Sequence, residues 1–171
     1  MKGYVQVYTG NGKGKTTASL GLALRAVGAG LKVFIGQFVK GQIYSEIKAI
    51  RESLTNITVE QYGGECFIGK NPTQKEIILA QNGLNEVRKI VSSGQYDLVI
   101  LDEANIATYF KLIDPIDLLD IIQHKPDHVE LVITGRNADK RIIEAADLVT
   151  EMKEVKHYYQ NGVKSRKGIE S

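Results

Sequence analysis

Apolar runs alternate along the chain with amphipathic stretches, and this alternation predicts the secondary structure. Runs rich in branched apolar residues predict strands at 5–8, 33–37, 57–61, 98–101, 131–134 and 148–152. Stretches with helical spacing of apolar positions predict helices at 15–29, 45–52, 73–92, 114–123 and 138–145. Strands that alternate with helices in this way indicate an α/β fold with a mostly parallel six-stranded sheet covered by helices on both faces.

Composition narrows the class of protein. The 171 residues include no internal repeat or low-complexity tract, so we expect one domain over residues 1–171. A formal net charge of +2 gives no reason to expect a nucleic-acid or membrane partner, and no apolar run reaches the ~18 residues of a membrane span. The single cysteine, Cys66, cannot form an intrachain disulfide, which favours a cytoplasmic protein.

A glycine-rich segment between the first strand and the first helix carries the strongest chemical signal. Glycines let the backbone wrap closely around phosphates, and the following helix presents free N–H groups and its positive dipole end. Lys15 is placed to reach the β- and γ-phosphates, and the Thr16 hydroxyl to bind Mg²⁺. The residues expected to hold a nucleoside triphosphate are Gly10, Asn11, Gly12, Lys13, Gly14, Lys15, Thr16 and Thr17.

The segment is a variant of the phosphate-loop pattern. Thr9 stands where the pattern has its first glycine, five residues before Gly14. A dinucleotide fingerprint is disfavoured, because Lys15 follows Gly12 at the place of its third glycine. A merely flexible turn is also disfavoured by the strand–loop–helix context.

The fourth predicted strand ends in two acids, Asp102 and Glu103, which predicts a metal site. In phosphate-loop proteins such a strand is expected to lie beside the first strand and to point a carboxylate at Mg²⁺. Thr16, a carboxylate, phosphates and water are suitable oxygen ligands for Mg²⁺ or Mn²⁺. We expect Glu103 to bind the ion directly, and Asp102 to act through water or as a supporting partner.

Other polar residues give weaker signals. Lys40 and Arg136 follow predicted strands at the carboxyl edge of the sheet, where ligands of open α/β sheets bind, and are candidates for contacts to phosphate or substrate. His157 lies among basic and aromatic residues, where we expect a surface hairpin with a turn at 161–162. The sequence shows no evident nucleophile or general base.

Several segments together resemble the ATP:corrinoid adenosyltransferases of the phosphate-loop type. The resemblance implies a RecA-like fold, usually a homodimer, and transfer of the 5′-deoxyadenosyl group of ATP to a reduced corrinoid with release of triphosphate. It also implies an electron donor that reduces Co(II) to Co(I), and a metal ion held by Thr16 and Glu103. The matching segments are 8–18, 37–41, 97–103, 134–136, 146–152, 156–157, 162–163 and 168–169.

The resemblance includes one departure that concerns the corrinoid. Family members carry a Phe-x-Trp pair, whereas this chain has Phe67 followed by Gly69 and contains no tryptophan. We expect Phe67 to contact the corrinoid.

Co(I) is a nucleophile without a proton to remove, so such an enzyme needs positioning and electrostatics more than acid–base groups. Another small phosphate-loop ATPase or kinase, and a corrinoid-binding protein without turnover, stay open as alternatives.

Overall fold

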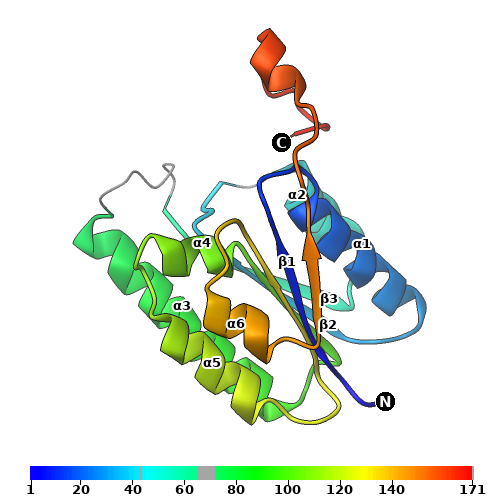
Figure 1. Ribbon diagram of the computed structural model, residues 1–171. Coiled ribbons are helices and arrows are strands. Elements are labelled where there is room, and N and C mark those ends of the chain that lie inside the picture. Colours follow the sequence, from blue (N-terminus) through cyan, green and yellow to red (C-terminus); the bar gives the residue numbers. More distant parts are fainter. Residues whose placement is uncertain (43, 65–71, 171) are drawn as a thin grey trace.

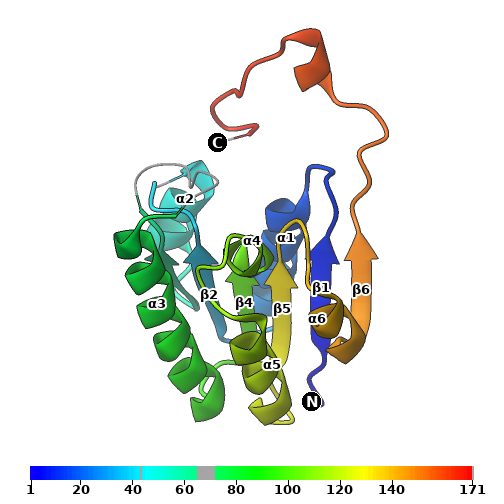
Figure 2. The same cartoon turned by 60° about the vertical axis from the view of Figure 1, so that its left-hand side comes forward.

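The chain folds around a sheet in which every strand runs in the same direction. The computed structural model describes residues 1–42, 44–64 and 72–170. The described strands are β1 (Val5–Thr9), β2 (Val33–Phe38), β3 (Ile57–Tyr62), β4 (Leu98–Asp102), β5 (Glu130–Thr134) and β6 (Leu148–Glu151). Their order in the sheet is β3-β2-β4-β5-β1-β6, and each neighbouring pair is parallel (Figures 1 and 2). The expected six-stranded parallel sheet is therefore confirmed.

The helices follow the predicted positions closely. They are α1 (Lys15–Gly28), α2 (Ser45–Ser53), α3 (Gln74–Ser93), α4 (Ala104–Tyr109), α5 (Pro115–His124) and α6 (Lys140–Ala145). The predicted cap of α5 is confirmed, because the Asp114 side chain accepts a hydrogen bond from the backbone N–H of Ile116 and Pro115 opens the helix. Within the described residues, none of these helices combines the length and apolar character needed to cross a bilayer.

Two local features differ from the sequence prediction. The helix α4 was not expected, because six residues are too few to show a helical period. The hairpin expected around His157 is wrong. A short 3-10 helix, Tyr158–Asn161, follows His157 and ends at Gly162 with a φ of 80°. The expected turn at 161–162 is present, but no described strand follows it to complete a hairpin.

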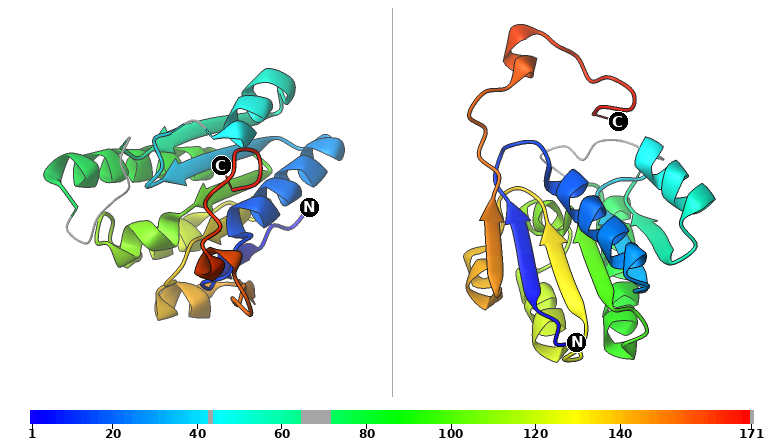
Figure 3. Two further views of the ribbon diagram at one scale, coloured as in Figure 1. Left: turned by 90° about the horizontal axis from the view of Figure 1, so that it is seen from above. Right: turned by 90° about the vertical axis from the view of Figure 1, so that its right-hand side faces the viewer.

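Helices cover both faces of the sheet, as expected for this fold class (Figure 3). On one face, α1 and α2 bury apolar side chains against β2, β3 and β4, among them Ala23, Ala26, Ile47 and Ile50. On the other face, α3, α4, α5 and α6 pack against the same sheet, with Leu84, Val87, Leu118 and Ile142 in the core. Residues of β4 are buried throughout, which accounts for its continuous apolar run.

The strand that ends in Asp102 does not lie beside β1, so the expected adjacency is wrong. β5 pairs with β1 on one side and with β4 on the other. Helix α1 packs over both β4 and β5, so its first turn reaches across the intervening strand toward the end of β4. With one strand inserted in this way, the α/β architecture is consistent with a RecA-like phosphate-loop fold.

Gly83 in α3 and Gly21 in α1 provide a matched test of the packing. A Cβ at Gly83 would lie 2.2 Å from Tyr62 Cγ, whereas a Cβ at Gly21 meets nothing within 4 Å. We expect Gly83→Ala to lower the free energy of unfolding in urea by about 1–3 kcal/mol, the usual cost of overpacking a core. Gly21→Ala should raise it by about 0.5–1 kcal/mol, because alanine favours a helix. Equal effects would contradict the contact between α3 and Tyr62.

Candidate functional site

The glycine-rich loop joins β1 to α1 and folds around the side chain of Lys15. The ammonium of Lys15 donates to the carbonyl oxygens of Gly10 and Gly12, at 2.7 and 2.8 Å. The side chain is buried, and among the described residues no carboxylate forms an ion pair with it. Burial is the main cause that lowers the Lys15 pKa below its ordinary value. A buried cation held only by neutral carbonyls favours an anionic ligand.

Glycines of the loop are required either by the close approach of the backbone that follows β6 or by their own backbone conformation. The backbone N–H of Gly12 donates to the carbonyl of Met152 at 2.6 Å, and a Cβ at Gly12 would approach that oxygen to 2.7 Å. Gly14 caps α1 with a φ of 119°, which side chains rarely allow. Thr9, at the position without glycine, is buried at the end of β1, and its carbonyl accepts from the N–H of Met152.

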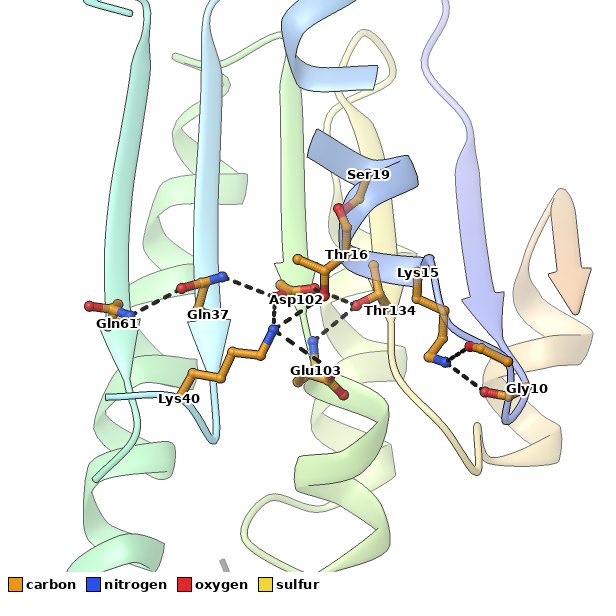
Figure 4. Close-up of polar contacts among 11 residues, drawn as sticks. Gly10, Lys15, Thr16, Ser19, Gln37, Lys40, Gln61, Asp102, Glu103 and Thr134 are labelled. Atoms are coloured by element: carbon orange, nitrogen blue, oxygen red, sulfur yellow. Dashed lines mark hydrogen bonds and ion pairs between the residues drawn. The ribbon is translucent and has the colours of Figure 1, made fainter. Parts of the chain in front are cut away.

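The carboxylate of Asp102 is the centre of the polar network (Figure 4). It is 1% exposed. Its Oδ1 accepts from the hydroxyls of Thr16 at 2.9 Å and Thr134 at 2.8 Å. Its Oδ2 accepts from Gln37 Nε2 and from Lys40 Nζ, both at 3.0 Å. The four donors engage both oxygens, so Asp102 holds α1, β2 and β5 to the end of β4.

Glu103 lies beside Asp102 but has a freer carboxylate. Its backbone adopts a φ of 58°, and its N–H donates to Thr134 Oγ1 at 3.0 Å. Its side chain is 21% exposed, and its described ion pair is with Lys40 at 3.9 Å. Burial, together with the charge of Asp102, raises the pKa of Glu103 above its usual value.

The oxygens at this point suit a hard cation. Thr16, Asp102 and Glu103 offer a hydroxyl and two carboxylates, the ligand types that Mg²⁺ prefers. The ammonium of Lys40 already lies among them, at 3.2 Å from Thr16 Oγ1. Burial lowers the Lys40 pKa, but the two carboxylates outweigh burial and raise it overall. Within residues 1–42, 44–64 and 72–170, no three His, Cys, Asp or Glu side chains form a metal cluster by themselves. A metal ion here therefore needs phosphate or water oxygens as well.

A chain of side-chain amides, which the sequence prediction missed, supports Asp102. Gln37 is fully buried in β2, and its Oε1 accepts from Gln61 Nε2 at 3.1 Å. This contact orients the Gln37 amide so that its nitrogen faces Asp102 (Figure 4). Gln61 also donates to the carbonyl of Gln42 at 3.0 Å. The sequence does contain one signal for this role, because Gln37 is a polar residue near the end of an otherwise apolar strand.

The C-terminal segment reaches back to the loop through Lys13. The ammonium of Lys13 donates to the Tyr158 hydroxyl, the Ile169 carbonyl and the Glu170 carboxylate, at 3.2, 3.0 and 3.2 Å. Arg166 and Tyr158 also donate to Glu170. A cavity of about 360 Å³ lies between the loop and residues 153–158 of this segment. No local pattern predicts this contact, because Lys13 and Glu170 are distant along the chain.

The predicted site residues are only partly brought together. Thr16, Lys40, Asp102 and Glu103 meet where β2 and β4 end, whereas the Lys15 ammonium is turned toward the carbonyls of the loop after β1 (Figure 4). Other residues of the predicted set are exposed at the rim of this site, and Phe67 lies outside the described residues. The exposed residues of the predicted set are Asn11, Lys13, Thr17 and Arg136.

Thr134 offers a test of this network that leaves the shape of the side chain unchanged. Its hydroxyl donates to Asp102 and accepts from the N–H of Glu103. We expect Thr134→Val to lower the free energy of unfolding in urea by about 1–3 kcal/mol, because both partners lose a buried hydrogen bond. Thr150→Val, on the exposed face of β6, should stay within about 0.5 kcal/mol. A Thr134→Val protein as stable as the Thr150→Val protein would contradict the network.

Comparison with known proteins assigns the family. The family model described as ATP:corrinoid adenosyltransferase BtuR/CobO/CobP matches residues 1–171. The chain is 35% identical to a corrinoid adenosyltransferase of Pseudomonas aeruginosa, over 99% of this chain and 84% of the relative. It is 33% identical to a corrinoid adenosyltransferase of Sinorhizobium sp, over 99% and 80%. It is 32% identical to the corrinoid adenosyltransferase CobA of Salmonella typhimurium, over 99% and 86%. With its phosphate loop and the acid pair of Asp102 and Glu103 in place, this chain belongs to the ATP:corrinoid adenosyltransferase family.

Proposed function

We propose that this protein transfers the 5′-deoxyadenosyl group of ATP to Co(I) of a reduced corrinoid and releases triphosphate. The observation that carries the proposal is the buried Lys15 ammonium, which lies in a phosphate loop and has no anionic partner among the described residues. Family membership over the whole chain supplies the identity of the second substrate.

The reaction requires no proton transfer. The electron pair of Co(I) attacks the 5′ carbon of the ribose and forms the cobalt–carbon bond. The bond between that carbon and the α-phosphate oxygen breaks, and the oxygen keeps the bonding electrons. The leaving group is therefore a highly charged triphosphate. A site that binds this anion with cations and N–H groups lowers the barrier directly.

The residues of the loop stabilise the leaving group. The Lys15 ammonium exchanges its two carbonyl partners for phosphate oxygens, and the N–H groups at the start of α1 face the same anion. Thr16 and Glu103 hold Mg²⁺ or Mn²⁺, which supplies further positive charge next to the triphosphate when bound. Glu103 is favoured over Asp102 as a direct ligand, because four donors already occupy the Asp102 oxygens.

Further parts of the proposal rest on the resemblance to the family. Phe67 contacts the corrinoid, and Arg136 at the exposed rim contacts phosphate or substrate. An electron donor reduces Co(II) to Co(I) before transfer, in keeping with a reducing cytoplasmic compartment. The protein acts as a homodimer. A kinase would need a base for its acceptor hydroxyl, and no described contact favours that alternative or a corrinoid carrier without turnover.

Lys15→Ala tests the proposal together with the assignment of the site. The protein is incubated with ATP, Mg²⁺ and chemically reduced corrinoid, and formation of the cobalt–carbon bond is followed by absorbance. We expect the parent protein to form adenosylated corrinoid and Lys15→Ala to lose at least about 100-fold in rate, the usual cost of removing one preorganised charge-stabilising group.

Lys48→Ala is the control for this assay. Lys48 is 70% exposed on α2 and pairs with Glu52 along the same helix, so its removal should leave the rate unchanged. A near-normal rate in Lys15→Ala would mean that the loop is not the triphosphate site. A parent protein that forms no adenosylated corrinoid would refute the proposed reaction.

A further inference from the structure

Lys40 occupies the position between the oxygens that are proposed to bind the metal ion. Its Nζ lies 3.0 Å from Asp102 Oδ2, 3.2 Å from Thr16 Oγ1 and 3.9 Å from Glu103 Oε1. Lys40 follows β2, whereas the oxygens belong to α1 and to the end of β4, so the ammonium points across the sheet edge toward them (Figure 4). One positive charge thus neutralises part of the acid pair.

The backbone before Lys40 is held in an unfavourable conformation. Val39 has a φ of 68°, a left-handed conformation that β-branched residues rarely adopt. Such strain persists where the surrounding structure enforces it, and the Val39 side chain packs against the core. The turn therefore directs Lys40 toward the acid pair. The ammonium also lies 5.8 Å from the centroid of the Tyr44 ring, which offers it a second partner.

A metal ion and this ammonium cannot occupy the same oxygens together. Mg²⁺ binds its oxygen ligands at about 2.0–2.1 Å. An ion at Thr16 and Glu103 would therefore lie within a few ångströms of Lys40 Nζ, and two cations at such a distance repel each other strongly. Lys15 differs in this respect, because its ammonium contacts carbonyls of the loop and not the acid pair.

We propose that Lys40 is a resident counter-cation, which neutralises the acid pair in the nucleotide-free protein and is displaced when Mg²⁺ enters with the triphosphate. The inference rests on the proposed function for the identity of the ligand, and it adds a role that the reaction itself does not require. In this arrangement Lys40 excludes free Mg²⁺ from the site, so the metal binds only together with the nucleotide. After displacement the ammonium turns toward the Tyr44 ring or the bound phosphates.

The test measures thermal unfolding of the full chain without nucleotide or corrinoid, as MgCl₂ is added at constant ionic strength. The midpoint of the parent protein should not change with Mg²⁺. Lys40→Met should unfold at a lower temperature without Mg²⁺, and its midpoint should rise by roughly 5 °C or more as Mg²⁺ saturates the freed oxygens. Lys40→Gln replaces Lys40→Met if the latter does not fold.

Two further variants separate displacement from simple loss of an ion pair. Lys40→Arg keeps the positive charge and should stay insensitive to Mg²⁺. Lys13→Met removes a loop cation that contacts Tyr158 and Glu170 instead of the acid pair, so the unfolding midpoint of this variant should not change with Mg²⁺. Unfolding of Lys40→Met that does not respond to Mg²⁺, or a parent protein that responds equally, would overturn the proposal. Because no corrinoid is present, this outcome is independent of whether the protein transfers an adenosyl group.

Discussion

The buried carboxylate of Asp102 is the interaction on which the candidate site depends. A charge that is 1% exposed is costly unless hydrogen bonds and a counter-ion compensate it. Here the hydroxyls of Thr16 and Thr134, the amide of Gln37 and the ammonium of Lys40 provide that compensation. Since these donors come from α1, β5, β2 and the turn after β2, satisfying one carboxylate also fixes the relative positions of four segments. The strand order β2-β4-β5-β1 makes this possible, because it places β4 next to β2 and within reach of α1.

Lys15, which is buried, and Lys40, which is half-buried, lie near this carboxylate in opposite environments. Lys40 is paired with acids, whereas Lys15 contacts only the loop carbonyls of Gly10 and Gly12 among the described residues. Lys15 is therefore prepared for an anion, and Lys40 lies where a cation is proposed to bind. This distribution of charge suits a reaction whose leaving group is a triphosphate and whose nucleophile has no proton. Such a reaction also accounts for a site without an evident general base, since Co(I) carries no proton that a base would have to remove.

The local features of the sequence predicted much of this structure, and the long-range ones did not. Strand periods, the Asp114–Pro115 cap and the glycine loop are encoded by neighbouring residues, so each was located within one or two positions. Which strands become neighbours depends on the path that each connecting helix takes over the sheet, and neighbouring residues do not encode that path. The position of β5 between β1 and β4 was therefore not expected. Gln37, Gln61 and the contact of Lys13 with Glu170 were missed for the same reason, because their partners are distant along the chain. The roles of Glu103 and Phe67, and the homodimer, stay predictions.

The most direct measurement of the central idea is the identity of the phosphate product. Reduced corrinoid, ATP and Mg²⁺ are incubated with the protein, and the phosphorus-containing products are identified by ³¹P NMR. If the loop holds a leaving group, inorganic triphosphate appears in equal amount to the adenosylated corrinoid. Conversion of ATP to ADP and phosphate without a matching amount of triphosphate would show that the loop serves the terminal phosphate instead, and would contradict this account.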